Sequence, residues 1–323
     1  MLITIIIPVY NGEKHISRCI STLCTQSYTD WEAIFINDGS TDSSRLILEE
    51  AAKKDRRIKV FSQRNQGAAA ARSFGMDKAE GEFITFLDVD DTLNKDFLQV
   101  MMNGFDNEKT DIVTGTFKIV AENGAIIKRK QIKPGYMTGK EYLKKVLCGY
   151  YGWELCGKVF RKRLFEKKPV SPSGLRIGED ASVFIQIASE AEFVRAQNTA
   201  LYNYIQYPSS ASHTLSERHA EETLEAAFFI ESFLKKKSFY EEIKKEISGM
   251  ILLHFSNSTR RGVLPWHNRL AEKVRKEHLS LGALSSIPLI KAIYICVALY
   301  ASPVLYYLKK KQTGKEKHKT TEI

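Results

Sequence analysis

Three acidic residues, Asp88, Asp90 and Asp91, lie within four positions of one another, directly after an apolar segment. Carboxylates this close repel each other, which raises the pKa of at least one of them unless a cation is bound. Hard oxygen ligands suit Mg²⁺ or Mn²⁺, which complete their coordination with water and substrate phosphate. The alternative is a helix N-terminal cap, which accounts well for Asp91 or Asp96 and less well for Asp88.

A second candidate is Asp38, which also follows an apolar segment. Its carboxylate could accept a hydrogen bond from a base N–H or a ribose hydroxyl. On its own it fits an Asx-turn better than a ligand contact. Asp42, at the start of an expected helix, is interpreted as a cap.

These residues need a scaffold, and residues 1–115 alternate short apolar runs with helical patterns. We expect strands at 4–9, 32–37, 58–62 and 82–87, and helices at 13–24, 41–52, 68–78 and 95–104, the second with Ser40 or Thr41 as its N-cap. Such alternation predicts a parallel sheet covered on both faces, with ligands beyond the carboxyl ends of the strands. The polar residues after the four strands would then share one edge.

The pattern changes after residue 111. Asn123-Gly124 predicts a hairpin between strands at 112–120 and 125–131, and Thr138 with Glu141 forms a capping box for a helix at 139–147. Further strands are expected at 193–196 and 200–204, and only helices from about 216. The predicted organisation is a domain at 1–215 (halves 1–115 and 116–215), a helical region at 216–283 and a membrane-associated segment at 284–323.

Four motifs in this order and spacing closely resemble the family 2 glycosyltransferases over roughly residues 1–215. They are Ile5-Ile6-Ile7-Pro8-Val9-Tyr10-Asn11, Asn37-Asp38-Gly39-Ser40-Thr41-Asp42, Asn65-Gln66-Gly67 with Arg72, and Phe86-Leu87-Asp88-Val89-Asp90-Asp91. The resemblance implies an α/β fold of GT-A type, with a Rossmann-like, mainly parallel sheet flanked by helices and an α-helical C-terminal extension. It also implies a nucleotide-sugar donor, usually a UDP-sugar, a divalent metal (Mn²⁺ or Mg²⁺) and inversion at the anomeric carbon.

The resemblance assigns roles only to residues at positions that match the family's motifs. It implies that Asp38 holds the uracil edge, that Asp88 approaches the ribose and that Asp90, together with Asp88, holds the metal on the diphosphate. The other nucleotide-site positions that it implies are Pro8, Val9, Tyr10, Asn11, Asn65, Gly67 and Arg72.

An inverting transfer needs a general base, and a carboxylate is the usual choice. Gly178-Glu179-Asp180 resembles the Glu-Asp motif at the family's acceptor site, which implies Asp180 as base and Glu179 as its neighbour or an acceptor ligand; spacing alone favours an N-cap pair. Lys158 is displaced from the family's Trp-x-Lys pattern at Trp153, so we interpret the basic run at 158–165 as a helix with a solvated face.

Residues 204–212 resemble a closing loop in which many relatives carry Arg where this chain has Ile205. Ser210 remains as a candidate phosphate contact. Other cations or His213 could replace the missing Arg.

The net charge of +10 is divided unevenly along the chain. Residues 1–120 carry 14 basic and 18 acidic side chains, so the positive excess lies in the remainder. Five cysteines at irregular spacing predict free thiols, and the N-terminal apolar run predicts a buried strand and not a signal peptide. Residues 287–308 are apolar and precede Lys309-Lys310-Lys311, which predicts attachment to an anionic membrane, either as a spanning segment or at the interface. The alternative is a core helix of the C-terminal region.

Together these features predict an enzyme at the cytoplasmic face of the cell membrane that extends a lipid-linked glycan for a surface polysaccharide. The oligomeric state is left open. A nucleotidyltransferase is one alternative, although residues 8–14 lack its Gly-rich, basic loop. A basic nucleic-acid-binding protein is the other, and the weakest, because no nucleic-acid motif is present and the basic residues mix with many Glu.

Overall fold

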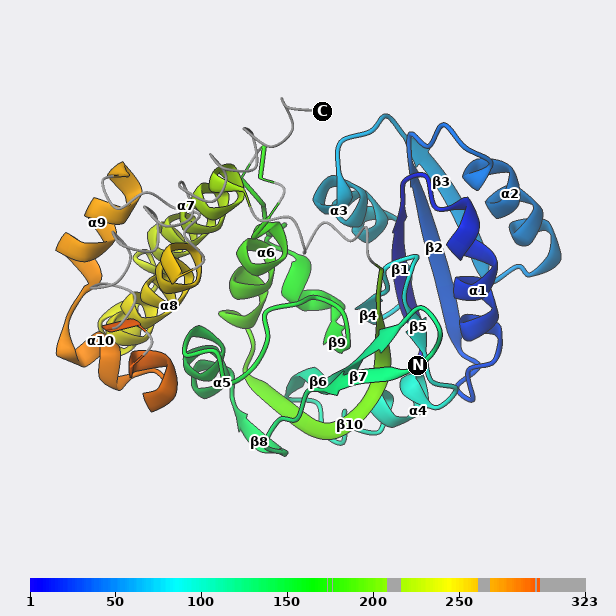
Figure 1. Cartoon of the computed structure of the whole chain (residues 1–323). Helices are drawn as coiled ribbons and strands as arrows, with labels where there is room; N and C mark the ends of the chain where they lie inside the picture. The colour runs from blue at the N-terminus through cyan, green and yellow to red at the C-terminus, as the bar shows by residue number, and fades with distance from the viewer. Residues whose placement is uncertain (173, 176, 208–215, 261–267, 294, 297–323) are drawn as a thin grey trace, which may run out of the picture. The chain divides into compact units, whose positions relative to one another are not determined.

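The computed structural model describes residues 1–323 except 173, 176, 208–215, 261–267, 294 and 297–323 (Figure 1). The chain divides into two compact units. The first comprises Met1–Tyr142, Trp153–Val170 and Val183–Ser210, and the second comprises Leu143–Gly152, Ser171–Ser182 and Ala211–Ile323. The second unit therefore takes two short internal segments together with the C-terminal part of the chain.

The first unit is built on one sheet whose N-terminal strands are parallel. These strands are β1 (Ile3–Val9), β2 (Trp31–Asp38), β3 (Ile58–Gln63) and β4 (Phe83–Phe86), in the spatial order β3-β2-β1-β4. β1 and β2 are buried along almost their whole length, as expected of strands covered on both faces.

The sheet continues beyond β4 with mixed directions. β9 (Lys158–Arg161) runs antiparallel to both β4 and β6 (Thr110–Ala121), and β10 (Phe193–Gln206) runs parallel to β6. Three shorter strands pair antiparallel to these: β5 (Thr92–Leu93) and β8 (Gly135–Thr138) with β10, and β7 (Ile126–Arg129) with β6. The predicted hairpin at Asn123-Gly124 is the connection from β6 to β7.

Helices cover both faces of the parallel strands. Figure 1 shows α1 (Glu13–Cys24) and α2 (Ser44–Lys54) on one side of β1–β3 and α3 (Ala68–Lys78) on the other. Ile16 and Leu23 of α1 are fully buried in the core, each stabilising it by about 1.5–3 kcal/mol. Gly75 of α3 packs so closely on Ile6 that a Cβ there would stand 2.5 Å from its Cγ2. The predicted α/β fold with helices on both faces is confirmed.

The remaining helices are short in the first unit and longer in the second. α4 (Phe97–Met102) and the 3₁₀ helix η1 (Lys162–Phe165) belong to the first unit, whereas α5 (Gly139–Leu147) and α6 (Glu179–Ala188) contribute residues to both. The second unit otherwise contains α7 (Glu217–Leu234), α8 (Tyr240–Arg260), α9 (Arg269–His278) and α10 (Leu281–Ser285). The predicted α-helical C-terminal extension is confirmed. In the part of the chain that the structure describes, no helix is both long and apolar enough to cross a bilayer.

Several predicted elements differ from the structure, and for two of them the backbone shows the reason. Residues 193–196 and 200–204 form the single strand β10, because a register shift against β6 between Ala196 and Ala200 accommodates the polar residues between them. α2 begins at Ser44 and not at Thr41, since Thr41 N donates to the side chain of Asn11 and Asp42 accepts from Ser44 N. The five cysteines are free thiols, as predicted.

Candidate functional site

A cavity of about 290 Å³ lies at the sheet edge where β1, β2 and β4 end. These strands are parallel, so their carboxyl ends meet there, at the edge where α/β proteins bind ligands. The volume is at the lower end of the roughly 300–1,000 Å³ of small-molecule sites, so it suits one part of a larger ligand. The cavity is lined by Pro8, Val9, Tyr10, Asp38, Asn65, Gly67, Ala68, Asp88, Val89 and Asp90.

Asp38 organises the loop that forms one side of this cavity. Its carboxylate is 2% exposed and accepts three hydrogen bonds: at Oδ1 from Gln63 Nε2 (2.8 Å) and Gln66 N (2.9 Å), and at Oδ2 from Gly67 N (2.8 Å). An ionised carboxylate offers about four acceptor positions, and these bonds occupy three of them. Asp38 therefore does more than an Asx-turn, because its contacts reach residues of the next loop.

The same loop depends on a close backbone approach. Gly39, the residue after β2, has φ of 72°, and a Cβ there would stand 2.8 Å from Asn65 N. A side chain at position 39 would therefore push Asn65 away from the cavity. Gly67, with φ of 88°, precedes the first turn of α3 and turns its N–H toward Asp38.

Tyr10 and Asn11 follow β1 but have different positions. The Tyr10 side chain is 53% exposed and lines the cavity, so its ring is available to stack on a planar group. Asn11 is not among the lining residues. Its Oδ1 accepts from Thr41 N at 2.8 Å, and its own N–H donates to Ser40 Oγ at 3.0 Å. Asn11 thus joins the ends of β1 and β2.

Asp88 is held on both carboxylate oxygens. Its Oδ1 accepts from Arg72 Nη2 at 2.9 Å, and its Oδ2 accepts from Cys156 Sγ at 3.4 Å. The Arg72 side chain is 9% exposed and pairs with Asp88 without lining the cavity, whereas Asp88 itself is 34% exposed. Sequence reasoning missed Cys156, which is 68 positions from its partner and carries no local motif.

Asp90 also lines the cavity, two residues further along the turn. Burial raises the pKa of its carboxyl group, and the negative charge of Asp88 raises it further, while His15 and Arg18 oppose the shift. The charge of Asp88 thus adds to the effect of burial on Asp90.

Asp91 has a structural role that differs from the helix cap considered for it. It is 1% exposed, and its carboxylate accepts from Tyr202 Oη at 2.5 Å and from Ile205 N at 2.8 Å. Burial, followed by the charge of Asp88, raises its pKa well above the usual range. Asp91 thus attaches the acidic turn to β10, and the short strand β5 follows it where a helix cap would need a helix.

The basic run after Trp153 is not the solvated helix expected from sequence. Lys158 begins strand β9 between β4 and β6 and is 4% exposed, and its ammonium group donates to the Glu154 carbonyl and lies 4.9 Å from the centre of the Phe184 ring. A long lysine stem can be buried in this way when its charged end finds a partner.

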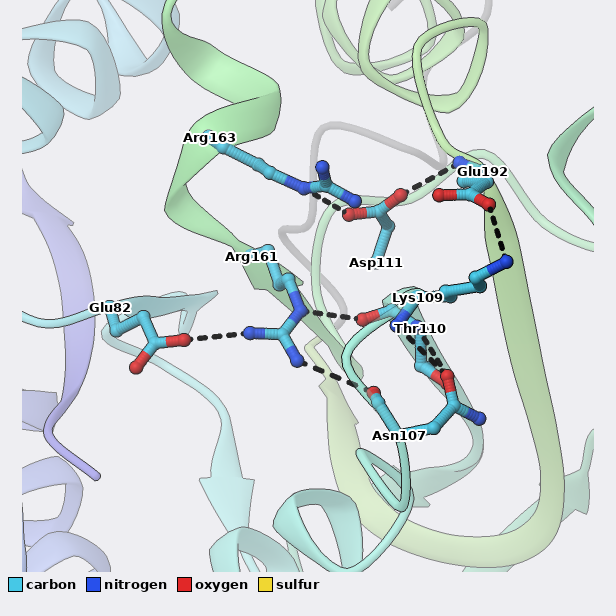
Figure 2. Close-up of polar contacts among 8 residues, drawn as sticks. All are labelled: Glu82, Asn107, Lys109, Thr110, Asp111, Arg161, Arg163 and Glu192. Atoms are coloured by element: carbon cyan, nitrogen blue, oxygen red, sulfur yellow. Dashed lines mark hydrogen bonds and ion pairs between the residues drawn. The ribbon is translucent and has the colours of Figure 1, made fainter.

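Arg161 and Arg163 are likewise engaged within the first unit, as Figure 2 shows. Arg161 donates to Glu82 and to the carbonyls of Thr110 and Asn107. Arg163 Nε donates to Asp111, at 2.8 Å. Asp111 is 1% exposed and also accepts from Glu192 N at 2.7 Å, so these contacts fasten β9 and η1 to β6 and β10 (Figure 2).

Glu179 and Asp180 are the first two residues of α6 and belong to the second unit. Both are half-buried, and acidic residues in a first turn are favoured by the helix dipole. Ser182 N donates to the Gly178 carbonyl at 3.0 Å and begins the helical hydrogen bonding. Ser210 and His213 lie outside the described residues.

The comparisons with known proteins agree with this site. The family model described as "Glycosyl transferase family 2" matches residues 4–167, which span the whole cavity. EpsH of Bacillus subtilis (strain 168) is 31% identical over 259 residues, covering 79% of this chain and 75% of EpsH. The chain belongs to glycosyl transferase family 2. It is a glycosyltransferase, which decides against the nucleotidyltransferase and nucleic-acid-binding alternatives.

Solved structures show the fold of this glycosyltransferase. S. aureus TarS in complex with UDP-GlcNAc superposes with a TM-score of 0.72 at 19% identity, covering 97% of this chain and 92% of the TarS chain. The mannosyltransferase PcManGT from Pyrobaculum calidifontis, in complex with GDP-Man and Mn²⁺, superposes with a TM-score of 0.54 at 15% identity, covering 93% and 86%. Both superpose on nearly the whole of this chain, which supports the GT-A architecture of this glycosyltransferase.

Members of this family commonly use a divalent metal, and the residues of this glycosyltransferase fit one. Among the described residues, no group of three or more His, Cys, Asp or Glu side chains could hold an ion by itself. Asp88 and Asp90 would therefore share the ion with water and phosphate oxygens, as Mg²⁺ is usually bound. A cation there would also offset the repulsion between the two carboxylates.

Proposed function

We propose that this glycosyltransferase transfers a sugar from a UDP-sugar to a hydroxyl group of a lipid-linked glycan, with inversion, in the synthesis of a surface polysaccharide. The observation that carries the proposal is the cavity itself, which brings Tyr10, Asp38, Asp88 and Asp90 from three strand ends to one edge of the sheet. An aromatic ring, a hydrogen-bond acceptor and two carboxylates are what a nucleoside diphosphate with a metal requires.

Four of the lining residues have a part in donor binding. Tyr10 stacks on the uracil ring, and the remaining acceptor position of Asp38 takes the N3–H of uracil. Asp88, held by Arg72, approaches the ribose hydroxyls. A metal ion held by Asp90 and Asp88, when bound, would neutralise negative charge on the diphosphate.

The transfer itself is an in-line displacement. The acceptor oxygen forms a bond to the anomeric carbon while the bond from that carbon to the diphosphate oxygen breaks, and UDP leaves with the electron pair. Asp180 takes the proton of the acceptor hydroxyl, with Glu179 beside it. This role rests on the resemblance of Gly178-Glu179-Asp180 to the family's acceptor-site motif and on the helix start at which both acids lie.

The experiment that tests this function is a donor screen. Purified protein is offered UDP-sugars and GDP-mannose with Mn²⁺, with Mg²⁺ or with EDTA, and the release of nucleoside diphosphate is measured. We expect release from a UDP-sugar that EDTA abolishes. Asp180→Asn is expected to lower kcat by at least about 100-fold, whereas Asp77→Asn, which changes an exposed acid paired with Lys168, serves as the control. Turnover that persists in EDTA, or that GDP-mannose alone supports, would contradict the proposal.

We also place the enzyme at the cytoplasmic face of the cell membrane, against an anionic surface. Four exposed apolar residues lie within 13 positions of sequence in the second unit: Leu281 is 86% exposed, Leu289 74%, Ile290 69% and Ile293 54%. In sequence they precede Lys309-Lys310-Lys311, which lie outside the described residues. Apolar side chains next to lysines are typical of interfacial binding to anionic lipid.

Vesicle sedimentation tests this attachment. We expect the protein to sediment with phosphatidylglycerol-containing vesicles, and a Leu289→Gln/Ile290→Gln variant to bind at least about fivefold more weakly because apolar area is lost. The matched control, Ile126→Gln/Ile127→Gln, alters two exposed apolar residues on β7 of the first unit. Equal binding by both variants would count against the assigned surface.

A further inference from the structure

Arg18 of helix α1 makes two short hydrogen bonds, one to the acidic turn and one to the residue that follows β10. Nη2 of Arg18 donates to the main-chain carbonyl of Asp90 and to the hydroxyl oxygen of Tyr207, each at 2.6 Å. Arg18 is half-buried, and its Nε is buried with no acceptor among the described residues. Burying a guanidinium group is costly, so its presence beside the acidic turn calls for a reason beyond packing.

Tyr207 directly follows β10 and is also held by the preceding turn of α1. Its hydroxyl lies 3.4 Å from His15 Nδ1, and the two rings are 5.1 Å apart between centroids. β10 itself also contacts the acidic turn, because Tyr202 and Ile205 donate hydrogen bonds to Asp91. The turn is therefore attached directly to β10 and, through Arg18, to Tyr207, the residue that follows β10.

The geometry of the Arg18 contact decides what it can do. The guanidinium group bonds the main-chain oxygen of Asp90, whose side chain lines the cavity. Fixing that carbonyl holds the peptide plane that follows Asp90, which restrains ψ of Asp90 and limits the directions in which its side chain can leave the backbone. Outer partners of this kind orient metal-binding carboxylates, and their loss typically weakens metal binding by about 10–100-fold.

We propose that Arg18 and Tyr207 are positioning residues for Asp90: Arg18 sets the main chain of the acidic turn so that the Asp90 carboxylate faces a divalent cation, and Tyr207 orients Arg18. The inference rests on the proposed metal role of Asp90. The sequence alone could not reveal this role, because the two partners of Arg18 lie 72 and 189 positions away along the chain.

The test measures Mn²⁺ binding and does not depend on turnover. Free Mn²⁺ is followed by electron paramagnetic resonance during titration of the full-length protein in the presence of UDP. We expect Arg18→Met to raise the Mn²⁺ dissociation constant at least about tenfold, Arg18→Lys to restore part of the affinity and Tyr207→Phe to weaken binding by about threefold. UDP binding measured in EDTA is expected to change less than about twofold in each variant, because a positioning role acts through the cation.

The control is Arg45→Met, which removes an exposed arginine on α2 whose partner is Glu49. Wild-type Mn²⁺ affinity in both Arg18→Met and Tyr207→Phe would overturn the inference while leaving the proposed metal site intact. Loss of UDP binding in EDTA would also overturn it, since it would show general damage to the site. If the wild-type protein bound no Mn²⁺, the metal assignment itself would fail and this inference with it.

Discussion

Replacing Asp38 by Asn removes one charge and one acceptor from the loop at the cavity. Asn keeps an oxygen to accept from Gln63 and Gln66, but its NH₂ group would face the Gly67 N–H, which now donates to Oδ2 at 2.8 Å. Losing a hydrogen bond to a charged acceptor costs about 1.5–3 kcal/mol, and a buried N–H without a partner costs a similar amount. We therefore expect the interaction between residue 38 and the Gly67 N–H to weaken by at least about 2 kcal/mol.

A weaker interaction with Gly67 is expected to lower the affinity for the donor nucleotide. At about 1.4 kcal/mol per factor of ten, a 2 kcal/mol loss lowers the fraction of molecules with the loop correctly formed by up to about 30-fold. The same substitution removes the acceptor position assigned to uracil. We expect Asp38→Asn to raise the dissociation constant of UDP by about 10–30-fold, with a lower Tm.

Isothermal titration of UDP in the presence of Mn²⁺ measures the effect. Asp77→Asn is the matched control, because Asp77 is an exposed acid on α3 that pairs with Lys168. If Asp38→Asn folds and binds UDP within about twofold of the wild type, then neither the loop contacts nor the assigned acceptor matters for donor binding, and the reasoning fails.

Three further results are expected. Tyr202→Phe removes the buried hydroxyl that donates to Asp91 at 2.5 Å and is expected to lower the free energy of unfolding by about 2–3 kcal/mol in urea, whereas an unchanged midpoint would contradict the buried contact. Burial and the charge of Lys291 lower the pKa of His254 to about 4. At a pH between this value and the higher pKa of His254 in the unfolded chain, the unfolded chain therefore binds a proton that the folded chain does not. Stability is then expected to fall by about 2 kcal/mol from pH 7.5 to pH 5, and His254→Gln is expected to remove that part of the slope; equal slopes would refute it. Tyr10→Ala is expected to weaken UDP binding by about 1–3 kcal/mol through lost stacking, by the same titration, and unchanged binding would rule out a stacking role.

The parallel half of the fold could be predicted because its signals are local. β1 and β2 are continuous buried runs, α1 places Ile16 and Leu23 on one face, and strand ends carry short polar motifs. Parallel topology then brings those motifs together without further information. This is why eight of the predicted nucleotide-site and metal residues line one cavity. The other two, Asn11 and Arg72, do not line it but form hydrogen bonds with Thr41 and Asp88.

What escaped prediction depends on partners far apart in the chain. β9 has only four residues with a basic residue at each end, and it is a strand because β4 and β6 pair with it on either side. The role of Asp91 depends on Tyr202, 111 positions away. Such contacts have no periodicity to detect, so they become visible only once the sheet is assembled.

The central claim is that Asp90 and Asp88 bind a metal on which transfer from a UDP-sugar depends. Its most direct test is UDP release as a function of Mn²⁺ concentration for the wild type and for Asp90→Asn. We expect saturable activation of the wild type, and for Asp90→Asn a loss of activity of at least about 100-fold that high Mn²⁺ restores only in part. Full activity of Asp90→Asn, with the same Mn²⁺ dependence as the wild type, would contradict the assignment of this cavity as the donor site.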